Sequence, residues 1–314
     1  MRVLVTGANG YLGQGVVKQL LDDGVEVVAT DFKADYIDER ADIRCANLFE
    51  IDEPYEYFGK PDIVLHMAWR DGFVHNSMNH INDLPKHVDF INKISKSGIQ
   101  RIVVMGSMHE VGFHEGSVNE ETVCRPLSYY GISKDALRNI VKLIAKENHI
   151  NYQWLRGFYI VGNSECGSSI FSKITQAAHA GKKEFPFTLG QNQFDFINYD
   201  DFCLQVAAAV EQEEICGIIN ICKGWPEKLA DRVERYIQEN GYDIHLNYGA
   251  FPDRPYDSKA IWGDAGKITM ILNNRKRMHS LNCSILFLLL FKSVLITPVS
   301  WRYSINIFKC SGKM

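Results

Sequence analysis

The chain has 314 residues, a net charge of −4 and eight cysteines. This length can bury a large core in one or two domains, and a weak charge without a basic block argues against a nucleic-acid partner. The cysteines form no C-x-x-C pair and no zinc-ligand spacing, so we predict no metal and a reducing compartment. Because the first predicted strand starts at Met1, we expect no signal peptide and a cytoplasmic protein.

The first informative segment is a strand, Arg2–Thr6, that leads into three glycines with the spacing G-x-x-G-x-x-G and then into an amphipathic helix pattern. Glycine lets the backbone turn tightly and approach a pyrophosphate, which the free N–H groups of the helix N-terminus bind. A glycine-rich turn that binds nothing is the alternative. The cofactor-binding residues predicted here are Gly7, Asn9, Gly10, Tyr11, Leu12 and Gly13.

A second predicted strand, Val25–Thr30, ends at Asp31. An acidic residue roughly 20 positions beyond the glycines is placed to bind a ribose 2′-hydroxyl. A carboxylate repels a 2′-phosphate, so Asp31 favours NAD over NADP. The alternative is a solvated aspartate at a strand end, but the complete strand–glycine–helix–strand unit favours the cofactor role.

Further strands are predicted at Ile63–Met67, Ile102–Met105 and Tyr152–Arg156, with helical patterns between them. This alternation predicts parallel strands with crossover helices in a doubly wound α/β sheet, whose ligands bind at the carboxyl ends of the strands. Beyond residue 160 the alternation loosens. We therefore predict a dinucleotide-binding domain at 1–160 and a small substrate-binding lobe, interleaved with the sheet, at 161–272.

A candidate catalytic pair, Tyr130 and Lys134, begins the next predicted helix. A spacing of four residues puts both side chains on one helical face, where the ammonium is expected to lower the pKa of the phenol. Such a tyrosine can exchange a proton with an alcohol while a nicotinamide carries the hydride. Ser107, after the predicted strand Ile102–Met105, is placed to hold the substrate oxygen, although a serine there could simply cap the next segment.

Taken together, these motifs resemble those of the extended short-chain dehydrogenase/reductases, and specifically the NAD-dependent epimerase/dehydratase family that acts on nucleotide sugars. Ser107, Tyr130 and Lys134 match that family's catalytic residues, and Asn82 matches an active-site asparagine. Residues 61–69 resemble a family strand, D-V-V-x-H-L-A-A, whose end lines the cofactor with Met67, Ala68 and Trp69. The resemblance extends to about residue 272 and implies a Rossmann-like sheet with a small C-terminal substrate-binding lobe, NAD as cofactor and a homodimer.

The resemblance also implies further roles and shows departures. Asn47-Leu48 stands where the family usually has Asp-Leu near the adenine, and Lys134 is expected to orient the nicotinamide ribose. Phe194 replaces an arginine that often contacts the substrate diphosphate, and Tyr159 replaces an asparagine. Arg254 is the substitute candidate for the diphosphate, because its guanidinium suits phosphate, unless it is a solvated loop residue. His109 is a candidate second acid or base, or a polar lining residue.

The predicted activity is a NAD(P)-dependent oxidoreductase acting on a nucleotide-activated sugar. The favoured reaction is reduction of a 4-keto-6-deoxyhexose by hydride transfer, with Tyr130 as acid and base. An epimerase that transiently oxidises its sugar with bound NAD, and a dehydrogenase of free uronates or sugars, remain as alternatives. A non-catalytic NAD-binding regulator is a third alternative, which the presence of both Tyr130 and Lys134 disfavours.

Residues 273–314 form an atypical tail of changed composition. Its longest apolar run, Ile285–Phe291, is far shorter than the ~20 residues of a membrane-spanning helix, so no membrane partner is predicted. A marginal anchor, an interface strand and a segment that is not native to this fold are the three interpretations. We favour the last.

Overall fold

The computed structural model describes residues 1–162, 169–252 and 258–277. Contacts divide the chain into two units, Met1–Leu272 and Asn273–Met314. In the second unit, the described residues 273–277 are helical, and the apolar run of the predicted tail lies outside the described residues. Across the described ranges, no helix is both long and apolar enough to span a membrane.

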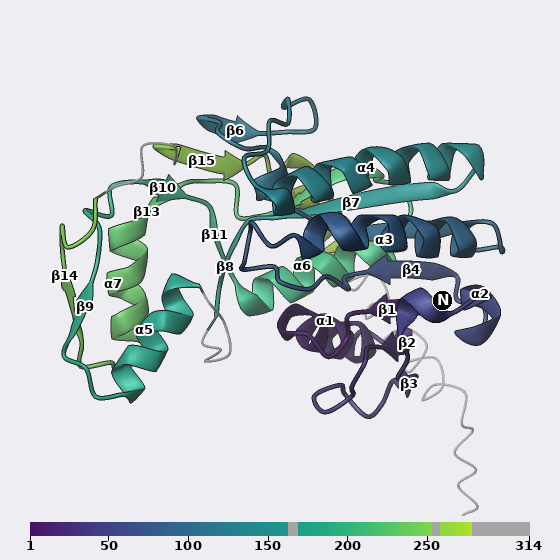
Figure 1. Cartoon of the computed structure of the whole chain (residues 1–314), viewed down its shortest axis with the longest axis horizontal. Coiled ribbons are helices and arrows are strands. Elements are labelled where there is room, and N and C mark those ends of the chain that lie inside the picture. The colour runs from purple at the N-terminus through teal and green to yellow at the C-terminus, as the bar shows by residue number, and fades with distance from the viewer. Residues whose placement is uncertain (163–168, 253–257, 278–314) are drawn as a thin grey trace, which may run out of the picture. The chain divides into compact units, whose positions relative to one another are not determined.

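The first unit is built on a parallel sheet of seven strands in the order β12-β7-β5-β4-β1-β2-β3 (Figure 1). The strands are β1 (Arg2–Thr6), β2 (Glu26–Thr30), β3 (Asp42–Ile43), β4 (Ile63–His66), β5 (Arg101–Ser107), β7 (Asn151–Gly157) and β12 (Gly217–Ile221). The five strands predicted from the sequence are all present. Strand order reverses between β1 and β4, and the crevice at such a switch point is where doubly wound sheets bind ligands.

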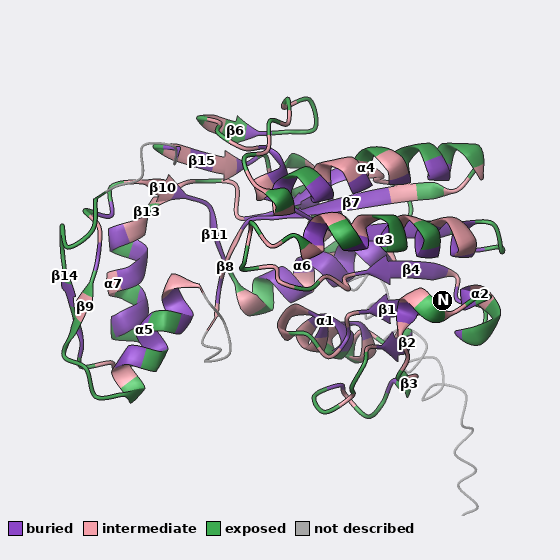
Figure 2. Ribbon diagram, viewed as in Figure 1, coloured by how far each residue is buried: buried purple, intermediate pink, exposed green. Residues whose placement is uncertain are grey.

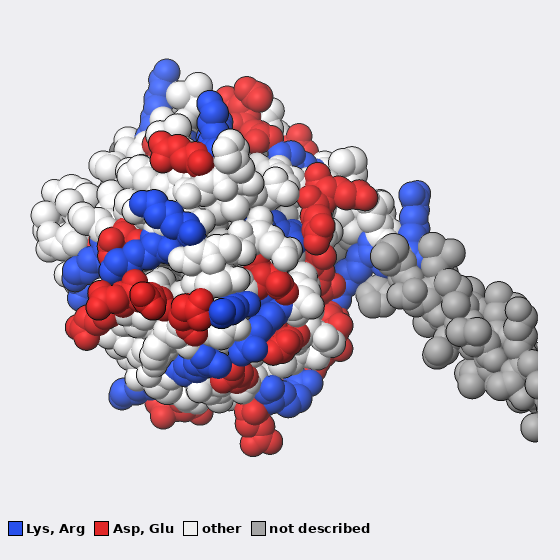
Figure 3. Space-filling model, turned by 90° about the vertical axis from the view of Figure 1, so that its right-hand side faces the viewer, with Lys and Arg blue, Asp and Glu red and all other residues white. Residues whose placement is uncertain are grey.

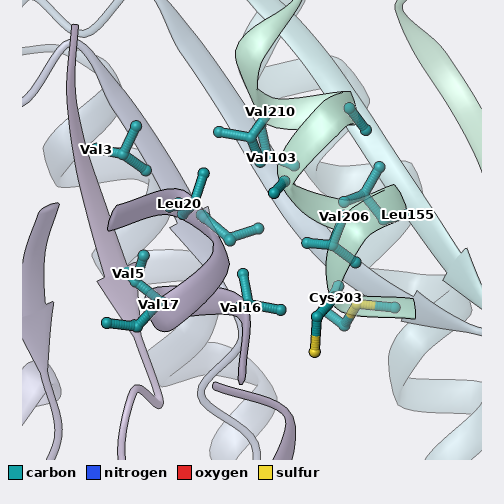
Figure 4. Close-up of a cluster of buried hydrophobic side chains, with 14 of the residues drawn as sticks. Val3, Val5, Val16, Val17, Leu20, Val103, Leu155, Cys203, Val206 and Val210 are labelled. Atoms are coloured by element: carbon teal, nitrogen blue, oxygen red, sulfur yellow. The ribbon is translucent and has the colours of Figure 1, made fainter. Parts of the chain in front are cut away.

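Helices cover both faces of this sheet. Successive residues of a strand point to opposite faces, so each strand packs against both layers of helices. Val3 and Val5 of β1 join the cluster with α1 (Tyr11–Asp22) and α6 (Tyr199–Glu211), as Figure 4 shows. Leu4 of the same strand packs on the other side, toward α3 (Asn79–Ser95) and α4 (Tyr129–Glu147). The strands are therefore buried on both faces, which Figure 2 shows as continuous burial along β4 and most of β7.

A smaller lobe with its own core carries α5 (Ile170–His179) and α7 (Leu229–Glu239), which lie beside one another (Figure 1). Its core is rich in aromatic side chains, among them Phe171, Phe196 and Tyr236. The short strands of this lobe and its junction are β6 (Gly116–Val118), β8 (Tyr159–Val161), β9 (Glu184–Pro186), β10 (Gln193–Phe194), β11 (Phe196–Asn198), β13 (Glu227–Lys228), β14 (His245–Asn247) and β15 (Ala260–Gly263).

The described residues also contain three short helices, α2 (Pro54–Tyr57) and the 3-10 turns η1 (Leu48–Glu50) and η2 (Met108–Glu110). Charged side chains of both signs are interspersed on the face shown in Figure 3. No single-sign patch therefore marks that face for a polyanionic or polycationic partner.

Candidate active site

The turn after β1 brings two backbones into direct contact at the switch point. Gly7 has a φ of +71°, and a Cβ added there would lie 2.7 Å from Cα of Ala68, just beyond β4. A Cβ added at Gly13 would lie 2.2 Å from the carbonyl oxygen of Gly7. Only glycine fits at these two positions, and the predicted motif therefore reflects backbone packing at the carboxyl edge of the sheet.

A small cavity opens beside this turn. The carboxylate of Asp31 lies at its wall and accepts hydrogen bonds from the backbone N–H groups of Asn9 at 3.1 Å and Phe32 at 2.7 Å. Mostly apolar groups surround one carboxylate, an arrangement that suits an adenine ring joined to a ribose hydroxyl. The lining residues are Thr6, Gly7, Thr30, Asp31, Phe32, Ala46, Leu48, Phe49 and Ala68.

Asn47 and the first residues of α1 support this cavity from outside. The Asn47 side chain accepts a hydrogen bond from the backbone N–H of Phe49 at 3.3 Å and so caps the turn that buries Leu48. Gly10 is exposed at the N-cap of α1, without a side chain over the free N–H groups. The carbonyl of Tyr11 accepts a hydrogen bond from the Tyr199 hydroxyl at 2.5 Å, and Leu12 packs against the core, so both residues anchor α1.

The predicted catalytic residues meet at the end of β5. Ser107 is the last residue of that strand, and its hydroxyl forms a hydrogen bond with Tyr130 at the start of α4. The Tyr130 backbone N–H donates to the carbonyl of His75 at 2.9 Å, which fixes the start of α4 against the loop after β4. Lys134, one turn further along α4, is 3% exposed and donates to the carbonyl oxygen of Met105 at 2.8 Å.

Burial sets the protonation of this pair. It raises the pKa of Tyr130 to about 12, although the hydrogen bond to Ser107 acts in the opposite direction. The expectation that Lys134 lowers this pKa is therefore wrong, because the lysine amine is engaged by the Met105 carbonyl and the Trp69 ring instead. Burial also lowers the pKa of Lys134 to about 7, opposed by the charge of Glu110. Tyr130 thus holds its proton at neutral pH and is poised to donate it.

Histidines surround Tyr130, and the sequence motifs did not identify most of them. The ring of His75 stacks on the phenol at a centroid distance of 5.4 Å, and the rings of His80 and His109 lie at 5.3 and 6.0 Å. Burial lowers the pKa of His109 to about 4, so this imidazole is neutral at pH 7 and can bind a substrate hydroxyl without carrying charge. The sequence does contain one indication of these histidines, since four of the ten histidines in the chain fall between residues 66 and 87.

A buried ion pair lies beneath the catalytic residues. Arg156 Nε donates to Glu110 at 2.6 Å and Trp154 Nε1 donates to the same carboxylate at 2.9 Å, with both charged side chains fully buried. Breaking such a pair leaves an uncompensated charge, so its role is to hold η2, and with it His109, in place. Glu110 is therefore a structural residue rather than a substrate acid or base.

Some predicted residues are not brought to this site. Asn82 is exposed on α3, whereas His80, Asp83 and His87 form the buried face of that helix, and its role as a cofactor contact stays a prediction. Arg254 lies outside the described residues. Met67 donates its backbone N–H to Thr6 Oγ1 at 3.2 Å and supports the strand end. No group of three or more potential metal ligands occurs in the described ranges.

Two residues that depart from the family pattern pack together on the lobe side. The rings of Tyr159 and Phe194 are 4.5 Å apart, and Tyr159 also lies 6.4 Å from His109. A continuous series of ring contacts therefore runs from Tyr130 through His109 to the aromatic core of the lobe.

Comparisons with known proteins identify relatives of this chain. A relative 36% identical over 269 residues is the dTDP-6-deoxy-L-talose 4-dehydrogenase (NAD(+)) of Aggregatibacter actinomycetemcomitans; the match covers 84% of this chain and 99% of that protein. The UDP-N-acetylglucosamine 4-epimerase of Methanobrevibacter ruminantium, solved with UDP-N-acetylmuramic acid, has a TM-score of 0.75 at 21% identity, covering 86% of this chain and 91% of that one. The UDP-glucuronic acid 4-epimerase of Bacillus cereus, solved with UDP-glucuronic acid and NAD, has a TM-score of 0.71 at 22% identity, covering 87% and 93%.

The sequence profile of the NAD dependent epimerase/dehydratase family matches residues 3–222. The chain therefore belongs to this family, which confirms the predicted family, the Rossmann-like fold and the prediction of a NAD-dependent enzyme.

Proposed function

We propose that the protein interconverts a ketone and an alcohol at C4 of a nucleotide-linked 6-deoxyhexose, acting mainly as a reductase of the 4-keto sugar with NADH. The observation that carries this proposal is the meeting of Ser107 and a protonated Tyr130 at the strand edge beside the glycine turn. The relative matched over 99% of its length is named as a 4-dehydrogenase of such a sugar, and microscopic reversibility makes a 4-dehydrogenase a 4-keto reductase in the other direction.

The residues at the switch point fit NAD. The cavity at Asp31 suits an adenosine, and the uncovered N-terminus of α1 at Gly10 suits a pyrophosphate. When bound, NADH supplies the hydride. We propose that Lys134, which is buried one helical turn from Tyr130, would donate hydrogen bonds to the hydroxyls of the second ribose when the cofactor is bound.

Two residues of this chain, Tyr130 and Ser107, complete the reaction at the carbonyl oxygen. As hydride adds to C4, the π electrons of the carbonyl move to its oxygen, and Tyr130 donates the proton that completes the alcohol. Ser107 donates a hydrogen bond to the same oxygen and holds it near the phenol. The raised pKa of Tyr130 suits this direction, because the acid must still carry its proton at working pH.

The surroundings of Tyr130 favour a 6-deoxy sugar over a uronate. C6 is bonded to C5, next to the reacting C4, so its substituent must lie close to Tyr130. The rings that contact this residue belong to Trp69, His75, His80 and His109. The Trp69 indole is the apolar member of this set and suits a methyl group, whereas a carboxylate would meet a His109 imidazole that is uncharged at neutral pH.

The direct test mixes the purified protein with a dTDP-linked 4-keto-6-deoxyhexose and either NADH or NADPH, and follows cofactor absorbance. We expect stoichiometric oxidation, faster with NADH. A parallel reaction with the free 4-keto sugar tests dependence on the nucleotide. If no cofactor is oxidised and it stays bound through gel filtration, the protein is an epimerase. Oxidation of a free uronate by NAD⁺ would instead identify a sugar-acid dehydrogenase.

A further inference from the structure

The amine of Lys134 lies in a buried environment, which disfavours its positive charge. The side chain is 3% exposed, and its hydrogen bond goes to one carbonyl oxygen, that of Met105, at 2.8 Å. An ammonium deprived of water needs further stabilisation. The face of the Trp69 indole provides it, because Lys134 Nζ lies 3.8 Å from the ring centroid, well within the range of a cation–π interaction.

The indole is itself held rigidly. Trp69 Nε1 donates to His80 Nδ1 at 3.0 Å, and the ring stacks on His87 at 4.5 Å with an interplanar angle of 14°. His80 Nε2 then donates to the carbonyl of Val74 at 3.0 Å, which fixes the tautomer of this imidazole. The indole also meets the Tyr130 ring edge-on at 6.1 Å. Trp69 thus connects α3, α4 and the end of β4.

The groups facing Lys134 leave the indole as the main stabilising surface. His66 on β4 and His87 on α3 are both neutral at pH 7, because burial lowers their pKa values, that of His87 to about 3. Tyr130 on α4 is protonated, and the negative charge acting on Lys134 is that of Glu110 on η2, already paired with Arg156. Trp69 occupies the position of the last alanine in the family motif D-V-V-x-H-L-A-A, where a methyl group could not play this role.

We propose that Trp69 is a positioning residue whose indole face holds the Lys134 ammonium in place of water, so that Lys134 keeps more of its charge than burial alone would allow and stays fixed on α4. The effect of Trp69 on turnover rests on the proposed function, whereas its effect on the charge of Lys134 does not. The cation–π contact stabilises the charged form, so its removal lowers the pKa of Lys134 and moves the alkaline limb of turnover to lower pH.

The test compares Trp69→Phe with Trp69→Leu, which leave similar space and differ in their π face. Trace labelling with acetic anhydride across a pH series, read by mass spectrometry, gives a midpoint for Lys134 in protein without cofactor or substrate. The labelling rate at the high-pH plateau measures how accessible Lys134 is to the reagent. The midpoint of the pH series is independent of that rate and measures the pKa of Lys134. We expect the midpoint in Trp69→Leu to lie about half a unit to one unit below that in Trp69→Phe. Equal midpoints would overturn the proposal.

The matched control is a second lysine–tryptophan contact. Lys223 Nζ lies 6.0 Å from the ring of Trp225, which is 58% exposed. Trp225→Phe and Trp225→Leu should leave the Lys134 midpoint and turnover unchanged. If wild-type protein does not reduce the 4-keto sugar, the proposed function fails, whereas the midpoint comparison still decides the role of Trp69. If it does reduce the sugar, the alkaline limb of kcat should shift with the midpoint.

Discussion

The cofactor side and the substrate side of the active site are built from different kinds of contact. At the glycine turn, backbone meets backbone, since a Cβ on Gly13 would lie 2.2 Å from the Gly7 carbonyl oxygen. In the lobe, side chain meets side chain, as in the edge contacts of Phe171 with Phe196 at 5.8 Å and with Tyr236 at 5.1 Å. Backbone contacts tolerate one residue type, whereas a packed aromatic core can be repacked. The cofactor side should therefore be the less tolerant of substitution.

The largest effect is expected where the two sides meet. Tyr130→Phe removes the proton donor and keeps the ring, so turnover should fall by about 10²–10⁴-fold while NADH binding is retained. Steady-state kinetics and titration of NADH fluorescence measure the two quantities separately. A fully active variant would move the proton transfer to another residue, and His109 would be the next to test.

Backbone contact on the cofactor side predicts the next largest effect. Gly13→Ala forces a methyl group against the Gly7 carbonyl, and overpacking of this kind costs about 1–3 kcal/mol, so the variant should unfold earlier in urea and bind NADH more weakly. Gly72→Ala is the matched control, because a Cβ there meets nothing within 4 Å. Equal urea midpoints for both variants would show that the turn relaxes easily and would weaken the contrast between the two sides.

The same contrast explains which parts of the molecule can be predicted from the sequence. The glycine turn, Asp31 and the five strands are specified by local spacing, because backbone geometry repeats with the chain. Asn82 lies on the exposed face of α3, one residue before the buried Asp83, and one residue of shift turns a helical side chain by about 100°. His75 and His80 come from a loop and a helix start that no motif connects.

The pKa of Tyr130 is the property of the site that the sequence predicts least well. The spacing of Tyr130 and Lys134 predicts a lowered phenol pKa, whereas the structure raises it, because burial outweighs a charge that is directed elsewhere. Spacing reports which face of a helix a side chain occupies, but it does not report which groups that face contacts. The partners of Lys134, Met105 and Trp69, follow from the packing of three elements.

The aromatic core of the lobe should tolerate substitution better than the glycine turn does. Phe171 is 2% exposed, and Phe171→Leu should cost less than Gly13→Ala, about 1 kcal/mol in the free energy of unfolding, because a hydrophobic side chain of similar volume can be repacked. Because we propose that the lobe binds the sugar, the KM for the nucleotide sugar should rise while the Kd for NADH stays unchanged. A parallel loss of NADH affinity would show that the two sides are mechanically coupled and do not respond independently.

The smallest and most specific effect is expected at Asp31. Asp31→Asn keeps one oxygen, which can still accept from the backbone N–H of Phe32 but loses the separate hydrogen bond from Asn9, and it removes the charge that repels a 2′-phosphate. The ratio of kcat/KM for NADPH over that for NADH should rise by about tenfold, since a like-charge contact is removed. Asp35→Asn, at an exposed position on the same loop, should leave the ratio unchanged. If the ratio does not move in Asp31→Asn, cofactor choice depends on the shape of the cavity rather than on this carboxylate, and the cofactor side would rely on packing as much as the lobe does.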